Sequence, residues 1–344
     1  MSLYSEIFEQ PASLLRLFHL QRKRIEKIAE TIKSRDIRYV FVAARGTSEN
    51  AGRFANYLFG ARNGYPVALA APSLFTYYNP PQLEGALVVG ISQSGRSPDI
   101  VSVLKEGRRQ GCLTLAITNE INSALADAAE FTLDIEAGEE TSVAATKTYT
   151  GELMAIAMLS AALTNDETFW EQIRSVPDWV QTALGYDPVM PISVQRYRSM
   201  SSCIVLGRGY DYATAHEWAL KLKELTYVEA ESYSSADFQH GPIALVDAKL
   251  PILAVIHKGA IYASMLDVLR RLQEERSAEL LVISDGEEAK ALAHTALPLP
   301  SGVPEWLSPL ISIIPAQLFC YHLAVAKGCD TETPRGMLKV TETI

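Results

Sequence analysis

The sequence predicts an α/β protein built from two similar domains in tandem, each a doubly wound parallel sheet flanked by helices in three layers. The chain has 344 residues, and because a compact domain commonly holds about 100–200 residues, its length favours two domains. Apolar runs typical of buried strands alternate with helix-like stretches, which is the pattern of a parallel sheet covered on both faces. The second half of the chain repeats the order of the first.

The first half begins with an amphipathic helix and then repeats strand, loop and helix. Apolar residues at helical spacing predict the opening helix, and short β-rich runs followed by Gly and Ser predict the strands. Pro98 opens one of the helices, because its fixed φ suits a first helical turn. The elements expected are a helix over 12–33, a strand over 38–44, a helix over 49–59, a strand over 85–91, a helix over 98–110 and a strand over 113–118.

The second half echoes this order. The offset from Arg45 to Arg208 equals the offset from Ile91 to Ala254, as a duplicated domain would give. The elements expected here are a strand over 202–206, a helix from Ala213, a strand over 252–256, a helix over 262–275 and a strand over 280–283.

Between the two halves, a Trp-containing helix over 169–184 and a Pro-punctuated stretch over 187–191 form the natural linker. The organisation expected is an N-terminal helix over 1–34, a first domain over 35–165, a linker helix over 166–198, a second domain over 199–330 and a C-terminal tail over 331–344.

The composition argues against nucleic-acid and membrane partners. The net charge of -9 comes from scattered acidic residues, which disfavours an open nucleic-acid surface. The N-terminus lacks the basic-then-apolar order of a signal peptide, and apolar stretches such as 153–163 fall short of the roughly 20 residues of a membrane span. The four cysteines and six histidines show no metal-ligand spacing. We therefore expect a cytoplasmic protein that needs no metal or other cofactor.

A hydroxyl-rich loop, SQSGRS over residues 92–97, lies between an apolar strand and a helix start. Its hydroxyls, side-chain amide and N–H groups suit a small anion, because the helix dipole adds about half a positive charge there. Thr47-Ser48 adds a second hydroxyl cluster at the same edge of the predicted sheet. An ordinary N-cap and turn is the alternative interpretation. The candidate phosphate ligands in the loop are Ser92, Gln93, Ser94 and Ser97.

The stretch AHEWALKLKELTYVEAE predicts a helix with two different faces. At about 100° per residue, Glu217, Lys221 and Glu224 fall on one narrow stripe, opposite an apolar side. One interpretation is a solvated charged face with pairs four residues apart. The other is that Glu224 is a base and Lys221 a cation that stabilises a developing enolate. These residues alone leave both interpretations open.

Two further residues stand in special positions. His240 lies in SADFQHGPIAL, where the following Gly241-Pro242 would hold an imidazole at a turn of the chain. Lys339 lies in the tail ETPRGMLKVTETI, which is not low-complexity, although a floppy tail is the usual interpretation of such a position. Neither residue indicates catalysis on its own.

Taken together, these segments resemble the sugar isomerase (SIS) family, specifically the isomerase half of glucosamine-6-phosphate synthase and the free-standing glucosamine-6-phosphate deaminases. The resemblance covers nearly the whole chain in order and implies two tandem SIS domains of flavodoxin-like architecture. The matching segments are EIFEQP, ARGTSENAG, ISQSGRSPD, EAGEETSVAATKTYT, LGRGYDYATAHEWALKLKELTYVEAESYSSADFQHGPIALVD and KGCDTETPRGMLKVTETI.

The resemblance implies a role for each matching position. Glu224 would move a proton between C1 and C2, and Lys221 would stabilise the enolic intermediate. His240 would assist ring opening from the neighbouring subunit of a homodimer, and Lys339 matches a lysine that can form a Schiff base with an open-chain ketose. The implied ligands of the hexose 6-phosphate are Thr47, Ser92, Gln93, Ser94, Ser97 and, through its backbone, Val143.

Two departures from the family limit this transfer. Ala145 stands where the family has a serine that can contact substrate, so selectivity is expected to differ. The glutaminase domain of the synthase is absent, so we expect no synthesis from glutamine. The expected reaction is conversion of glucosamine 6-phosphate to fructose 6-phosphate and ammonia. Alternatives left open are a fructosamine-6-phosphate deglycase, a galactosamine-6-phosphate deaminase, a phosphosugar isomerase and a non-catalytic sugar-phosphate sensor.

Overall fold

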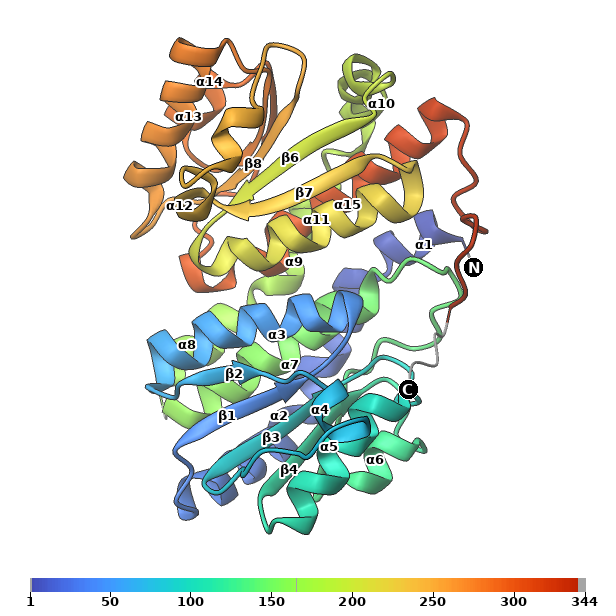
Figure 1. Cartoon of the computed structure of the whole chain (residues 1–344), viewed down its shortest axis with the longest axis vertical. Coiled ribbons are helices and arrows are strands. Elements are labelled where there is room, and N and C mark those ends of the chain that lie inside the picture. The colour runs from blue at the N-terminus through green and yellow to red at the C-terminus, as the bar shows by residue number, and fades with distance from the viewer. Residues whose placement is uncertain (1, 165, 340–344) are drawn as a thin grey trace. The chain divides into compact units, whose positions relative to one another are not determined.

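The structure is a computed structural model that describes residues 2–164 and 166–339 (Figure 1). By its packing the chain divides into two compact units. The N-terminal unit comprises residues 9–141, 145–177 and 338–339, and the C-terminal unit comprises residues 2–8, 142–144 and 178–337.

The N-terminal unit is built on a five-stranded parallel sheet of order β2-β1-β3-β4-β5. β3 and β4 are buried along their whole length, as central strands covered on both faces must be. The strands are β1 (Tyr39–Ala43), β2 (Val67–Leu69), β3 (Ala86–Ile91), β4 (Leu113–Thr118) and β5 (Phe131–Asp134).

Helices cover both faces of this sheet. Gly52 of α3 packs against Val42, whereas Gly107 of α5 packs against Val88, and these two valines point to opposite faces. α2 and α3 pack with α7, whereas α4 and α6 pack with α5. The helices are α2 (Gln10–Ser34), α3 (Gly46–Leu58), η1 (Phe59–Asn63), α4 (Ser73–Thr76), α5 (Pro98–Arg109), α6 (Ala124–Ala128), α7 (Lys147–Thr164) and α8 (Glu167–Arg174).

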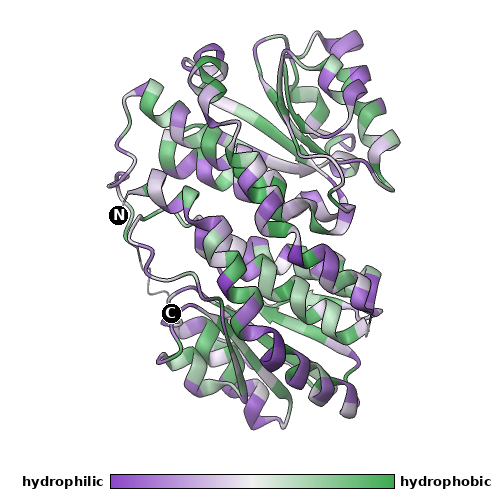
Figure 2. Cartoon of the chain, turned by 180° about the vertical axis from the view of Figure 1, so that it is seen from behind, coloured by the Kyte–Doolittle hydropathy of each residue, from purple (hydrophilic) through white to green (hydrophobic). Residues whose placement is uncertain are grey.

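The C-terminal unit repeats this architecture. Its parallel sheet has the order β10-β9-β8-β6-β7, which read from β7 is the same topology as the first sheet. Figure 2 shows hydrophobic residues along the strands of both sheets. The strands are β6 (Ser202–Gly207), β7 (Glu229–Ser234), β8 (Ile252–Ile256), β9 (Leu280–Ser284) and β10 (Thr295–Pro298).

Helices again cover both faces. α13 packs on an apolar cluster that includes Ile204 and Ala254, and α11 packs with α15. The longer helices are α11 (Tyr212–Thr226), α13 (Tyr262–Arg276) and α15 (Ser308–Lys327). The shorter ones are α1 (Leu3–Phe8), α9 (Val176–Leu184), η2 (Asp187–Val189), α10 (Met190–Ser193), η3 (Val194–Tyr197), η4 (Gly209–Asp211), α12 (Ser235–Phe238), η5 (Pro242–Leu245), α14 (Glu287–Leu292) and η6 (Glu305–Leu307).

The predicted fold class is confirmed, because both sheets are parallel, flanked by helices and wound in the order 2-1-3-4-5 of flavodoxin-like folds. Sequence reasoning missed the strands β2, β5, β7 and β10, whose partly exposed residues give no continuous apolar run. The linker helix predicted over 169–184 is two helices, α8 and α9, which meet at Ser175.

One helical segment within the described residues, Glu305–Lys327, is long and apolar enough to cross a membrane by composition alone. Most of it, 78% of its most apolar window, is buried inside the protein. α15, which makes up most of this segment, packs against α11 in the C-terminal unit, so the hydropathy of the segment is that of a core helix.

Candidate functional site

The predicted phosphate loop lies at the edge of the first sheet where the strand order reverses. β1 pairs with β2 on one side and with β3 on the other, so the loops that follow β1 and β3 leave the same edge in opposite directions. Open α/β sheets bind ligands at this kind of edge. Thr47 lies in the first turn of α3, and residues 92–97 connect β3 to α5. The structure therefore brings the two predicted hydroxyl clusters to one edge.

Gly95 sets the shape of the loop. Its φ of +61° lies in the left-handed region, and a Cβ there would stand 2.1 Å from the hydroxyl of Ser123. The Gly95 N–H donates to the carbonyl and to the hydroxyl of Ser92, at 3.3 and 3.2 Å. A tight turn of this kind places the following residues at the start of α5.

Ser97 occupies the N-cap position of α5, but its side chain makes no capping hydrogen bond. The ordinary N-cap that was the alternative interpretation of this loop is therefore not present in its usual form. Ser48, by contrast, donates its hydroxyl to buried Glu152 of α7 at 2.7 Å. Of the two residues in that cluster, Ser48 serves the packing of the unit.

A cavity of about 520 Å³ opens beside this loop in the N-terminal unit. Gln93 and Ser94 line it, which are two of the predicted phosphate ligands, together with Arg96 from the same loop. The remaining walls are polar and largely acidic; they are formed by Arg16, Asn119, Glu120, Asp134, Glu136, Gly138, Glu139 and Glu140.

Glu140 joins the tail lysine to this cavity. The Lys339 ammonium lies 2.6 Å from Oε2 of Glu140, whose side chain is fully buried. Lys339 is therefore tied to a residue that lines the cavity with Gln93 and Ser94, and this position is not a tail without contacts.

Val143 and Ala145 lie in the segment between β5 and α7, and both are partly exposed. By packing, Val143 belongs to the C-terminal unit and Ala145 to the N-terminal unit. Within the C-terminal unit, buried Glu6 holds this segment by accepting hydrogen bonds from the N–H and the hydroxyl of Ser142.

The charged stripe of the predicted helix is buried in the C-terminal unit. Lys221 of α11 lies 3.3 Å from Glu217 and also pairs with Glu224. The Lys221 and Glu217 side chains are 1% and 0% exposed, whereas the Glu224 side chain is 14% exposed. The expectation of a solvated charged face is wrong, although the expected pairing along the helix is present.

This arrangement fixes the charge of the lysine. Burial alone would lower the pKa of Lys221, but the attraction of Glu217 and Glu224 outweighs burial, so the pKa of this ammonium is raised. Lys221 therefore stays a cation, and the carboxylate of Glu224 is the member of the group that reaches the surface. A cation fixed beside an accessible base is the arrangement needed to remove a proton and stabilise the resulting anion.

His240 follows α12 and is exposed. No hydrogen bond joins its imidazole to Glu224 or Lys221 among the described residues. Gly241 after it adopts a φ of +141°, so the turn predicted at Gly241-Pro242 is present. Its contribution across a subunit interface remains a prediction.

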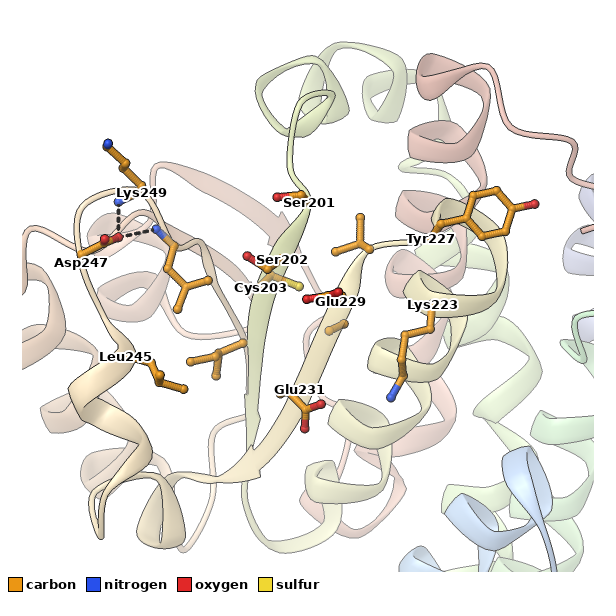
Figure 3. Close-up of a pocket in the computed structure, with 14 residues that line it drawn as sticks. Ser201, Ser202, Cys203, Lys223, Tyr227, Glu229, Glu231, Leu245, Asp247 and Lys249 are labelled. Carbon is orange, nitrogen blue, oxygen red and sulfur yellow. Dashed lines mark hydrogen bonds between the residues drawn. The ribbon is translucent and has the colours of Figure 1, made fainter. Parts of the chain in front are cut away.

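A larger cavity, of about 770 Å³, lies in the C-terminal unit and contains none of the predicted site residues (Figure 3). Lys223 and Tyr227 of α11 line it together with Glu229 and Glu231 of β7. Cys203 also lines this cavity, and burial raises the pKa of its thiol to about 12, which leaves it unreactive. Within residues 2–164 and 166–339, no group of three or more His, Cys, Asp and Glu residues is arranged to hold a metal ion.

Sequence reasoning missed several carboxylates that build the site. Glu140 lies in the matching segment EAGEETSVAATKTYT, and Glu9 in EIFEQP pairs with buried Lys147 at 2.6 Å. Asp99 is buried in the first turn of α5 and binds Nε of Arg45 at 2.8 Å. An acidic residue shortly before a Thr-rich helix start is a capping signal that could have revealed Glu140.

The SIS domain family matches residues 35–162 and 197–327. The glutamine–fructose-6-phosphate aminotransferase (isomerizing) of Thermococcus kodakarensis is 33% identical over 97% of this chain and 56% of its own length. The chain thus spans about half the length of the curated relatives it matches.

Two solved structures are also similar. The C-terminal domain of glucosamine-fructose-6-phosphate aminotransferase from Francisella tularensis is 29% identical, with a TM-score of 0.87 over 96% of this chain and 98% of that one. The glucosamine-6-phosphate deaminase of Thermotoga maritima is 20% identical, with a TM-score of 0.78 over 100% of both chains, a likeness that shows the fold alone. With two matched segments, two parallel sheets of one topology and a hydroxyl-rich loop at the edge of the first, this chain belongs to the SIS domain family.

Proposed function

We propose that this protein is an isomerising deaminase that converts glucosamine 6-phosphate and water to fructose 6-phosphate and ammonia. Membership of the SIS family and similarity to isomerising aminotransferases support a sugar phosphate as the substrate. The observation that carries the proposal is the buried Lys221 with its two carboxylates, of which only Glu224 reaches the surface.

In this proposal the N-terminal unit binds the phosphate. Ser94, Ser97 and Gln93 supply donors beside the N-terminus of α5, where the helix dipole favours an anion. Thr47 adds a hydroxyl from the first turn of α3 at the same sheet edge. Holding the phosphate away from the reacting carbons orients the sugar, which lowers the entropic cost of the chemical step.

The chemistry is a proton transfer followed by hydrolysis. After the pyranose ring opens, Glu224 removes the C2 proton of the aldehyde, and the electron pair forms a C1–C2 double bond while the C1 oxygen becomes an enolate or enol. Lys221 stabilises the negative charge that develops. Return of a proton to C1 gives the C2 imine, and water adds at C2 and releases ammonia, which leaves the ketone. General acid–base steps of this kind contribute about 10²–10⁴-fold each.

His240 assists ring opening from the neighbouring subunit of a homodimer, which its exposed position permits. The site works on a soluble hexose 6-phosphate in the cytoplasm, without nucleic acid or membrane as a partner. None of the steps assigned to these residues calls for a nucleotide or a metal.

Another phosphosugar isomerase of the SIS family is equally consistent with the similarities. The test is ammonia release by purified protein from glucosamine 6-phosphate, beside galactosamine 6-phosphate and a fructosamine 6-phosphate. We expect rapid release from glucosamine 6-phosphate. Release from another of these substrates alone assigns a sister activity. Silence with all three, together with aldose–ketose exchange of a plain hexose 6-phosphate, assigns an isomerase, and binding without any turnover assigns a sensor.

A further inference from the structure

Two backbone N–H groups of the loop before α13, residues 257–261, donate to carboxylates of the chain. The N–H of Lys258 donates to Oδ1 of Asp285 at 2.8 Å, and the N–H of Ala260 donates to both oxygens of Glu305 at 3.1 Å each. α13 follows with 15 residues, so the partial positive charge at its start favours anions at this loop. The loop therefore already binds anionic groups, and they come from the protein itself.

Gly259 shapes the place that the Glu305 carboxylate occupies. A Cβ at Gly259 would lie 2.2 Å from the carboxyl carbon of Glu305 and 2.4 and 2.6 Å from its two oxygens. These are the three heavy atoms nearest to such a Cβ, so the carboxylate fills the space that a side chain at this position would need. The loop thus has a cradle of carboxylate size, formed by a residue without a side chain and the N–H of Ala260.

A well-packed segment holds Glu305 at this cradle. Glu305 begins η6, whose next two residues, Trp306 and Leu307, are 2% and 0% exposed, and α15 follows directly. The carboxylate is therefore attached to the core of the C-terminal unit. Residues 258–260 of the loop are exposed, so an anion from solvent can reach the same place once the carboxylate is removed.

His257 gives the loop a buried polar group with unused capacity. Its side chain is 3% exposed, and Nδ1 lies 2.8 Å from the carbonyl oxygen of Lys258. Its Nε2 makes no hydrogen bond among the described residues and lies 3.6 Å from Oδ2 of Asp285. His257 and Glu305 both act electrostatically on buried Asp211, so the imidazole and the carboxylate belong to one charged cluster. A protonated Nε2 is a donor that an oxyanion at this loop can use.

We propose that the loop before α13 is a second oxyanion site of this chain, closed by Glu305 as its resident ligand. The ligand class is a small oxyanion of carboxylate size, which Glu305 supplies from within. The contact excludes anions of the solvent from this loop and fastens the start of α15 to the start of α13. The proposal does not depend on the reaction proposed above, because every contact that carries it lies within the C-terminal unit.

Formate is the probe for this site. Glu305→Ala removes the resident carboxylate and leaves the N–H of Ala260 and the space at Gly259 for an anion of the same shape. In thermal unfolding of the full chain in a chloride buffer, we expect Glu305→Ala to lower Tm by about 2–6 °C. We expect about 100 mM formate to restore at least half of that loss, because a ligand that binds only the folded state stabilises it by mass action.

Three controls separate binding at this loop from a general effect of salt. Chloride at the same concentration should restore nothing. Glu305→Gln, whose side chain still fills the cradle, should gain no more from formate than the wild type. Glu274→Ala, at an exposed position of α13, should keep the wild-type Tm and respond to formate as the wild type does. Equal gains from formate in the wild type and in Glu305→Ala, or no gain in Glu305→Ala, overturn the proposal.

A double-mutant cycle locates the effect. Gly259→Ala should lower the Tm of the wild type, because the new methyl group meets Glu305, but it should cost little in Glu305→Ala, where the three clashing atoms are gone. In the double variant the methyl group occupies the cradle, so formate should no longer stabilise the protein. The double variant stays measurable if Glu305→Ala alone is too unstable, since its cradle is filled. Additive losses in Tm, or a gain from formate in the double variant, overturn the proposal.

Discussion

The loops after β3 and after β8 occupy the same place in two sheets of the same topology, yet they are built differently. The first, residues 92–97, presents three serines and a glutamine beside a cavity. In the second, residues 257–261, the N–H of Ala260 donates to both carboxylate oxygens of Glu305, at 3.1 Å each. The place that would receive an external anion in the first copy is occupied in the second by a carboxylate of the chain itself.

The supports beneath these loops are alike. Arg45 reaches from the loop after β1 to Asp99 in the first turn of α5, and Arg208 reaches from the loop after β6 to Ser264 in the first turn of α13. Both units therefore have an arginine side chain that joins one loop to the first turn of the next helix, although the loops after β3 and after β8 differ.

A second contact between helices, a hydroxyl donating to a buried carboxylate, is present in both units with the two groups interchanged. Ser48 near the start of α3 donates to Glu152 of α7, whereas Asp211 just before α11 accepts from Ser308 and Ser312 of α15. In the N-terminal unit the carboxylate of this contact belongs to the later helix, α7, whereas in the C-terminal unit it precedes the earlier helix, α11. A contact between hydroxyl and carboxylate is present in both units. This comparison teaches that the scaffold tolerates such exchanges, and that the loops after β3 and after β8 have diverged on a shared topology.

The largest effect is expected at Glu224, the base in the proposed reaction. Glu224→Gln removes the base but keeps the shape of the side chain, so turnover should fall by about 10³-fold or more while phosphate binding persists. The measurement is kcat for ammonia release, with binding of fructose 6-phosphate by calorimetry. Lys223→Met, on the exposed side of the same helix, should leave turnover unchanged. Wild-type activity in Glu224→Gln would remove Glu224 from the mechanism.

The next effect separates the two loops. Ser94→Ala combined with Ser97→Ala should raise KM roughly 100-fold, because hydrogen bonds to a charged group are worth about 1.5–3 kcal/mol each. The matched change in the other copy, Lys258→Ala, should leave KM as it was. Steady-state kinetics with glucosamine 6-phosphate decide the matter, and an equal rise in KM from Lys258→Ala would show that the second loop also binds substrate.

A third effect concerns the pH dependence of stability at Asp211. Burial raises the pKa of Asp211 to about 6, against the opposing effects of His257 and the two serines. The folded state keeps this proton up to about pH 6, whereas the unfolded chain releases it near pH 4, so Asp211 makes stability fall as pH rises between these values, by about 2–3 kcal/mol in all. Urea unfolding should show Asp211→Asn gaining that amount on the wild type between pH 4 and pH 7. Parallel pH profiles would contradict it.

The smallest effect is expected in the loop after β8, where Glu305 packs against Gly259. In Gly259→Ala the new Cβ would stand 2.2 Å from the carboxyl carbon of Glu305, so we expect a loss of about 1–3 kcal/mol in the free energy of unfolding with KM unchanged. Gly60→Ala is the control, since its nearest neighbour would be 3.9 Å away. Gly95→Ala should cost stability and raise KM as well. A raised KM in Gly259→Ala would make the two loops functionally alike.

The sequence allowed the central strands, the hydroxyl loop and the stripe of α11 to be predicted, because each is a local pattern of a few residues. It did not show that Lys221 and Glu217 are buried, since burial depends on α15 and on the sheet, which lie far along the chain. Glu140 was missed for the same reason, because its partner Lys339 is 199 residues away. The edge strands escaped because exposure on one side interrupts their apolar pattern.

The place of α15 in the C-terminal unit has a consequence for the order in which the two units become stable during synthesis. The sheet of the N-terminal unit and the helices that cover it come from residues 9–177, apart from the docking of the tail. The packing of α11 is completed by α15, which ends at Lys327. At about 5–20 residues per second, the ribosome needs roughly 8–30 s to add the residues between these points. During that interval the exposed apolar faces of α11 and of the second sheet are the surfaces that a chaperone would meet.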